Sequence, residues 1–111
     1  MLREIKGTQR LPRLLQFKVT GTGTAAITEG GSDGTLVDNG TGDYTITFAK
    51  PFARTPAVNG LVIRGSTSLV ARVHALSTTA IQVKLFAVDG TTATDGAFDL
   101  SILGWDAADQ N

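Results

Sequence analysis

The chain contains one histidine, His74, which is the first residue to test for acid-base or metal chemistry. It lies in LVARVHAL (69–76), two residues after Arg72. A serine hydrolase needs its histidine to face a serine and a carboxylate, and the sequence lacks the G-x-S-x-G turn that presents such a serine. A lone histidine in a strand is more often a surface or interface residue. We therefore expect no catalytic residue and interpret the protein as a non-enzyme.

Two other patterns resemble ligand-binding loops. GTGTAAITEG (21–30) is rich in glycine, but it lacks the third glycine, a G-K-[ST] sequence and a following helix that would bind a phosphate. Asp33 with Asp38, and Asp89 with Asp95, bracket polar loops, but the alternating acidic pattern of a calcium loop is absent. Turn formation explains these aspartates better. With no cysteine available as a ligand either, we expect no cofactor and no metal.

Trp105 and Tyr44 are the aromatic residues that could stack on a sugar. Either of them, with Asp, Asn and Thr of the loop at 29–43 or at 89–96, would form a glycan-binding site. Trp105 could instead cap the core at the end of the last strand, and we favour that role. No pair of carboxylates has the spacing that glycoside hydrolysis requires.

The composition describes one neutral domain with uneven charge. Its 111 residues carry ten basic and ten acidic side chains. Residues 1–18 hold five basic residues against one acid, a net charge of +4, whereas residues 99–111 carry a net charge of −3. A neutral balance argues against binding to nucleic acid, which needs a broad basic surface. The basic end suggests an arm that contacts an acidic partner, through Arg3, Lys6, Arg10 and Arg13.

The segments that would position these residues are short, alternating and bounded by turn residues, which is typical of an all-β fold. We expect strands near 15–19, 25–28, 36–37, 43–49, 57–64, 69–76, 80–88 and 98–105. Gly60 indicates a bulge. About seven to eight strands predict a single antiparallel β-sandwich, jelly-roll-like, over residues 14–111, preceded by an extended arm over residues 1–13.

DYTITFAKPFARTPAV (43–58) is a strand that runs into a corner. Pro51 and Pro56 cannot donate ladder hydrogen bonds, so the strand should end there. Phe52 is expected to be the buried plug of that corner.

The strands at 69–76 and 80–88 have apolar residues on both faces. Leu69, Ala71, Val73 and Ala75 make one face. We expect Val70, Leu76 and Phe86 to point the other way. Part of the second face should therefore meet another subunit or a covering arm.

The run GTGDYTITFAKPFARTPAV (40–58), with FDLSILGWD (98–106) near the C-terminus, resembles a pattern of bacteriophage virion proteins. Small β-sandwich head decoration (cement) proteins and tail-fibre domains carry it, and H-type lectin domains are similar more loosely. The resemblance implies a capsid decoration protein that binds and stabilises the head shell. The alternative is a lectin-like glycan-binding module of a tail fibre or adsorption apparatus.

The resemblance also implies partners and a location. The partners would be the major capsid protein and copies of the chain itself, as a homotrimer. The place would be the outer capsid surface of the virion, after synthesis in the host cytoplasm. No apolar run approaches the length of a membrane span and the N-terminus lacks a signal-peptide pattern, so we expect a soluble protein with no membrane partner.

Overall fold

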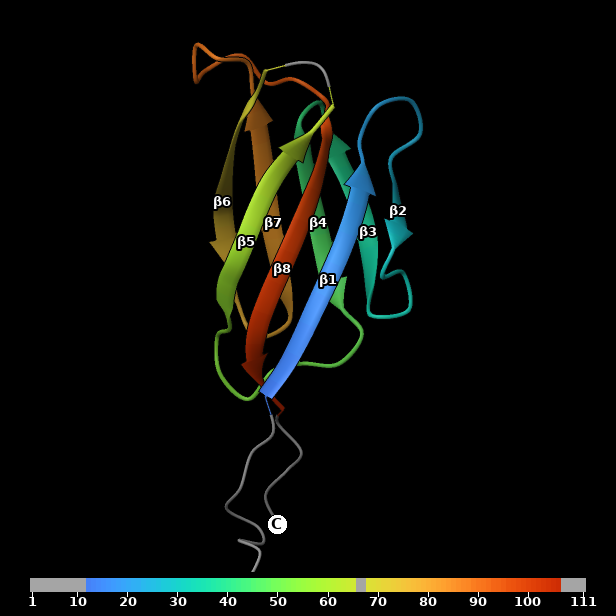
Figure 1. The fold of residues 1–111 in the computed structure, drawn as a ribbon, viewed down its shortest axis with the longest axis vertical. Coiled ribbons are helices and arrows are strands. Elements are labelled where there is room, and N and C mark those ends of the chain that lie inside the picture. Colours follow the sequence, from blue (N-terminus) through green and yellow to red (C-terminus); the bar gives the residue numbers. More distant parts are fainter. Residues whose placement is uncertain (1–11, 66–67, 107–111) are drawn as a thin grey trace, which may run out of the picture.

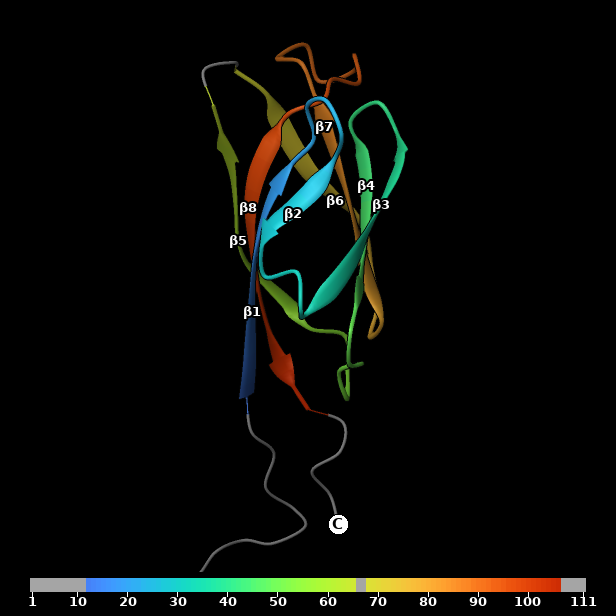
Figure 2. The same ribbon diagram turned by 90° about the vertical axis from the view of Figure 1, so that its right-hand side faces the viewer.

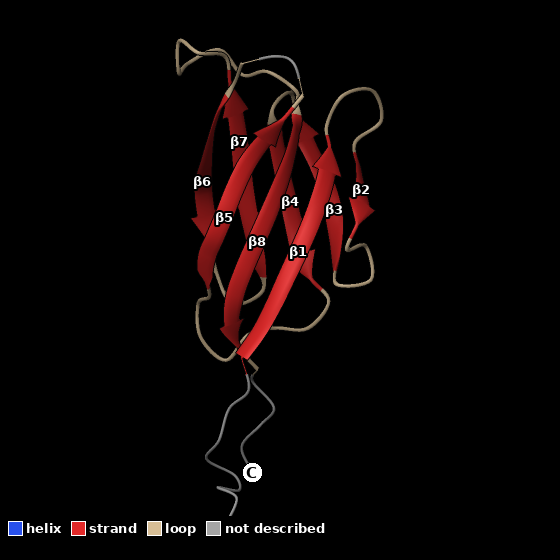
Figure 3. Cartoon of the chain, in the orientation of Figure 1, coloured by secondary structure: helices blue, strands red, loops and turns tan. Residues whose placement is uncertain are grey.

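The computed structural model describes residues 12–65 and 68–106, and Figure 1 and Figure 3 show that these form strands and loops without a helix. The strands of the described residues are β1 (Pro12–Thr20), β2 (Ala26–Glu29), β3 (Gly34–Gly40), β4 (Asp43–Phe48), β5 (Ala57–Arg64), β6 (Val70–Leu76), β7 (Ala80–Phe86) and β8 (Ala97–Trp105).

The strands form two four-stranded antiparallel sheets that pack face to face. Sheet A has the order β2-β1-β8-β5, and sheet B has the order β3-β4-β7-β6. Figure 2 shows the two layers nearly edge-on. The prediction of an all-β antiparallel sandwich is confirmed.

The core lies between the sheets and comes from their central strands. Alternate residues of β1, β8, β4 and β7 point inward, because side chains of a strand alternate between its two faces. Each of these strands buries three apolar side chains, and Phe52 completes the core. The full set is Leu15, Phe17, Val19, Tyr44, Ile46, Phe48, Phe52, Ile81, Val83, Leu85, Phe98, Leu100 and Ile102.

β1 begins earlier than the expected arm boundary. Pro12 pairs with Trp105 and Arg13 with Gly104, so these two residues belong to the sheet and not to an arm. The side chain of Arg13 is only 18% exposed, since it lies over the Phe52 ring at 4.1 Å from the centroid. The prediction that Arg13 belongs to the arm is therefore wrong, and its guanidinium already has partners inside the domain.

Each of the four outer strands has one register shift against its neighbour, and two of these shifts bear on the predictions. The bulge expected at Gly60 is confirmed, since the β5–β8 register shifts between Val58 and Gly60. A second bulge lies between Val73 and Ala75 of β6. Because the extra residue reverses the alternation, Leu76 packs against the core. The prediction that Leu76 points outward is therefore wrong.

The proline corner closes one end of the sandwich around Phe52. Its ring meets Phe48 edge-on with centroids 5.2 Å apart. Gly104 leaves the space for the ring, since a Cβ there would lie 2.5 Å from it. Arg13 covers the corner, with its Nη2 donating to the carbonyl of Lys50 at 2.8 Å and its Nε 3.0 Å from Asp106. The expectation that Phe52 is the buried plug is confirmed, at 2% exposure.

We predict that Phe52→Ala lowers the free energy of unfolding by about 3 kcal/mol or more, because it empties the centre of this corner. Urea denaturation measures the change. Val88→Ala serves as the matched control, since Val88 is among the exposed apolar residues, and it should change stability by less than about 0.5 kcal/mol. Equal effects of the two substitutions would contradict this account of the corner.

Candidate functional site

His74 lies on the outer face of sheet B, at the β6 bulge, and is exposed. Its neighbours on that face form a polar network that is complete in itself. The Asp43 carboxylate accepts hydrogen bonds from Gln82 at 2.8 Å and from Asn39 at 3.2 Å. Burial raises the pKa of Asp43, but these hydrogen bonds outweigh burial and leave the pKa below its usual value. The network is structural, because its donors and acceptors satisfy one another.

The aspartates of the loops also hold the backbone in place. Asp89 accepts from the backbone N–H groups of Thr91 and Thr92 and from the Thr92 hydroxyl, and these hydrogen bonds lower its pKa to about 2. Asp38 accepts from the N–H of Gly40. The described part of the chain contains no group of three or more His, Cys, Asp or Glu side chains placed to hold a metal ion. The expectation that these aspartates form turns agrees with the hydrogen bonds.

Tyr44 lies in the core with no exposed surface, so it cannot contact a glycan. Its hydroxyl lies 2.8 Å from Asp95 Oδ1 and 3.2 Å from the carbonyl of Gly21. The same carboxylate oxygen accepts from the N–H of Gly42. The proposed glycan contact at Tyr44 is therefore wrong. The hydroxyl instead ties the loops at one end of the sandwich together.

Trp105 lies at the other end of the molecule, and it does not cap the core. It follows the inward-facing Gly104 on β8, so its side chain points out of sheet A and is 46% exposed. The register places Pro12 beside Trp105 and Leu14 beside Leu103, and Ala57 pairs with Leu103 on the opposite side. Leu14 is 51% exposed and Leu103 42%. We call this surface, Pro12, Leu14, Ala57, Leu103 and Trp105, the apolar strip.

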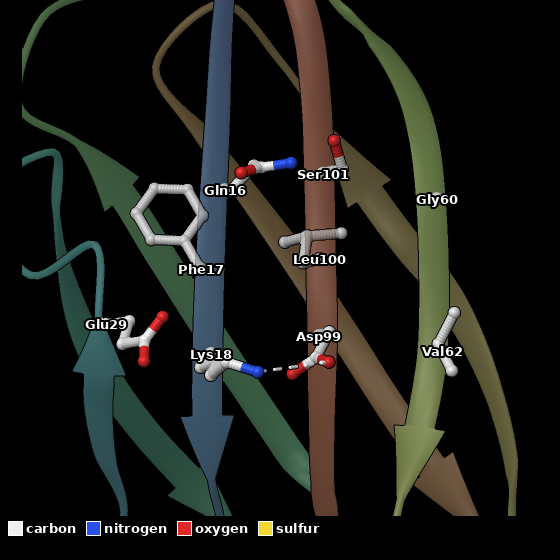
Figure 4. A pocket seen from close by; sticks show the side chains of 9 residues that line it. All are labelled: Gln16, Phe17, Lys18, Glu29, Gly60, Val62, Asp99, Leu100 and Ser101. Atoms are coloured by element: carbon white, nitrogen blue, oxygen red, sulfur yellow. Dashed lines mark ion pairs between the residues drawn. The ribbon is translucent and has the colours of Figure 1, made fainter.

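A depression of about 240 Å³ adjoins the apolar strip on the same face of sheet A. Gly60 and Ser101 face each other across β5 and β8 and leave room because both side chains are small. Figure 4 shows the Gln16 amide reaching toward Ser101, and the Lys18–Asp99 ion pair lies further along the strands. The Ser101 Oγ is buried and has no hydrogen-bond partner among the described residues.

The apolar strip and the depression make up the candidate site, and our interpretation of the sequence missed most of it. A signal for the apolar strip was present in FDLSILGW. The alternation that buries Phe98, Leu100 and Ile102 continues to Gly104, so Leu103 and Trp105 point outward. Of the predicted partner-binding residues, Arg3, Lys6 and Arg10 lie outside the described residues. The described chain enters the sheet at Pro12, which is itself part of the apolar strip.

Comparisons with protein-family models, with curated proteins and with solved structures found no match to this chain. Within residues 12–65 and 68–106, no helix is long and apolar enough to cross a membrane.

We predict that Tyr44 does not ionise near its ordinary pKa of 10 while the protein is folded, because burial and then the Asp95 carboxylate raise its pKa. Above pH 10 the unfolded chain releases this proton and the folded chain keeps it, so the free energy of unfolding should fall as pH rises. Tyr44 is the only tyrosine, so tyrosinate absorbance reports it directly.

The matched variant is Tyr44→Phe, which should lose about 1–3 kcal/mol at neutral pH, since it removes the hydroxyl that bonds Asp95 and the carbonyl of Gly21. Its stability should also vary less with pH above 10 than that of the wild type. Reversible tyrosinate formation near pH 10 in the native protein would contradict the buried hydrogen bond.

Proposed function

We propose that this chain is a non-enzymatic structural protein of a bacteriophage virion, a decoration (cement) subunit that binds the outer surface of the head. The observation that carries the proposal is the apolar strip. An exposed patch of this kind, on one face of a small rigid domain, marks a surface for protein contacts. It lies at the end of the sandwich where the basic N-terminal residues join the sheet.

The contrast between the two outer faces supports an assembly role. Sheet B presents a network of side chains that hydrogen-bond one another, around Asp43 and Asn39. The apolar strip on sheet A has no charged side chain. Covering the apolar strip therefore gains apolar contact without the cost of ion desolvation.

The arrangement of aromatic residues supports assembly over glycan recognition. A sugar site on this chain would use Trp105 or Tyr44 with the polar loops. Tyr44 is buried, and Trp105 has Pro12 and Leu103 around it in place of polar groups. We therefore do not retain the glycan-binding alternative.

In this proposal the basic residues Arg3, Lys6 and Arg10 contact the major capsid protein, and the sandwich is the rigid body that they attach. Many copies on one shell give avidity, so each single contact can be weak. The homotrimer implied by the resemblance stays a prediction.

We predict that deletion of residues 1–11 leaves the sandwich folded but weakens binding to assembled heads at least tenfold. The deletion stops before Pro12 because Pro12 and Arg13 are part of β1. Cosedimentation with heads of the encoding phage measures binding, and the melting temperature checks the fold. The full-length protein should also bind less tightly as salt increases, because salt screens exposed charges.

A charge variant separates the basic residues from the rest of the segment. Arg3→Gln, Lys6→Gln and Arg10→Gln together should reproduce the loss. The control, Lys50→Gln with Arg54→Gln, removes two exposed cations from the body and should bind normally. If full-length protein fails to cosediment with heads, the virion proposal is wrong. If both variants bind as well as the wild type, the basic residues are not the contact.

A further inference from the structure

We propose that the outer face of sheet A pairs with the same face of a second copy, and that Trp105 of each copy enters the Gly60–Ser101 depression of the other. This pairing goes beyond the proposed function and does not depend on it, and it stands against the homotrimer that the resemblance implies. A second copy is the occupant because the face carries both halves of the contact, a projecting indole ring and a depression.

The spacing of these two features satisfies two-fold symmetry. Trp105 and Ser101 lie on the same face of β8, each two residues from Leu103. Consider a two-fold axis that runs across the strands, along the row formed by Leu14, Leu103 and Ala57. This axis places β8 antiparallel to β8 of the second copy, with Leu103 opposite Leu103. The residue two positions after Leu103 in one copy then faces the residue two positions before Leu103 in the other. Trp105 therefore faces Ser101, as a self-complementary contact requires.

The chemistry of the depression fits an indole ring. Its volume of about 240 Å³ is below the roughly 300–1,000 Å³ of small-molecule pockets, so it suits a single side chain. The Ser101 Oγ on this face has no hydrogen-bond partner among the described residues. The indole N–H of Trp105 is a donor that needs an acceptor when it is buried. Gln16 and Asp99 also line the depression and provide acceptors on the same surface.

The charges of the face favour self-association over an acidic or basic partner. The row at the axis and the rows on either side of it carry no charged side chain pointing outward. Further along the strands, Asp99 lies 2.6 Å from Arg64 and 3.7 Å from Lys18, and Glu29 lines the same part of the depression. These charges lie away from the axis. Two identical copies can therefore approach without bringing like charges together at the centre.

The size of the face sets the expected strength. Three strands about 4.8 Å apart and about seven residues long give a contact plane of roughly 330 Å² per copy. Projecting side chains make the buried area larger than this flat plane, but it stays below the roughly 800 Å² per partner of a standard stable interface. We therefore expect a reversible dimer with a dissociation constant in the micromolar range.

Sedimentation of the full chain over a wide concentration range tests the pairing. The expected species are a monomer of 11.6 kDa and a particle of twice that mass. Trp105 is the only tryptophan, so its emission reports its own burial. The emission should shift to the blue and become protected from a soluble quencher as the dimer forms.

Three variants locate the contact. Leu103→Lys places two like charges at the axis and should abolish the dimer, whereas Val37→Lys on the outer face of sheet B should not, although Val37 is similarly exposed, at 47% against 42%. Trp105→Ala should weaken the dimer at least about thirtyfold, as expected for a buried aromatic anchor. Gly60→Val should fill the depression and weaken it similarly. The fold should tolerate this change, because an added Cβ would have its nearest contact with Ser101 Cβ, at 3.9 Å.

The outcomes separate this inference from the virion proposal. A chain that stays monomeric at high micromolar concentration, or forms a trimer, overturns the pairing whether or not it binds heads. A dimer that persists in Leu103→Lys, or is lost equally in Val37→Lys, also overturns it. A dimer that depends on Leu103, Gly60 and Trp105 supports it even if the protein binds no head.

Discussion

Burial of one face of each sheet is the constraint on which the whole structure depends. A strand that slips by one residue would move its apolar side chains to the solvent. β1, β4, β7 and β8 each present three apolar residues in strict alternation, so each has only one register that fills the core. The outer strands tolerate bulges because they lie at the sheet edges, where they bury less.

This constraint also explains what could be predicted from the sequence. The strands of the core, the bulge at Gly60 and the plug at Phe52 follow from alternation, glycine and proline, which act locally. The direction of Leu76 could not be predicted, because a bulge inside β6 depends on its pairing with β7. The candidate site was harder to predict from the sequence than the strands were. Trp105 points outward because Gly104 must face the core to admit the Phe52 ring, a contact between distant segments.

Burial also divides the polar chemistry of the molecule between its two ends. At the end that holds Tyr44, side chains of the loops satisfy backbone groups and one another, so the residues that looked most chemical in the sequence are structural. At the other end the chain has Phe52 inside and an apolar strip outside. The apolar strip is thus made of aliphatic and aromatic residues that a search for catalytic motifs passes over.

The antiparallel pairing of β1 with β8 has a consequence for engineering. Because Pro12 pairs with Trp105, the start of β1 and the end of β8 lie at the same end of the sandwich, as Figure 1 shows. A short linker could join these ends, and new termini could open in the turn at Gly90, where an added Cβ would meet no atom within 4 Å. Such a circular permutant would keep every strand pair of both sheets. It would put one short linker in place of the two chain ends at the pole that carries the apolar strip, and cargo fused to the new termini would project from the opposite pole.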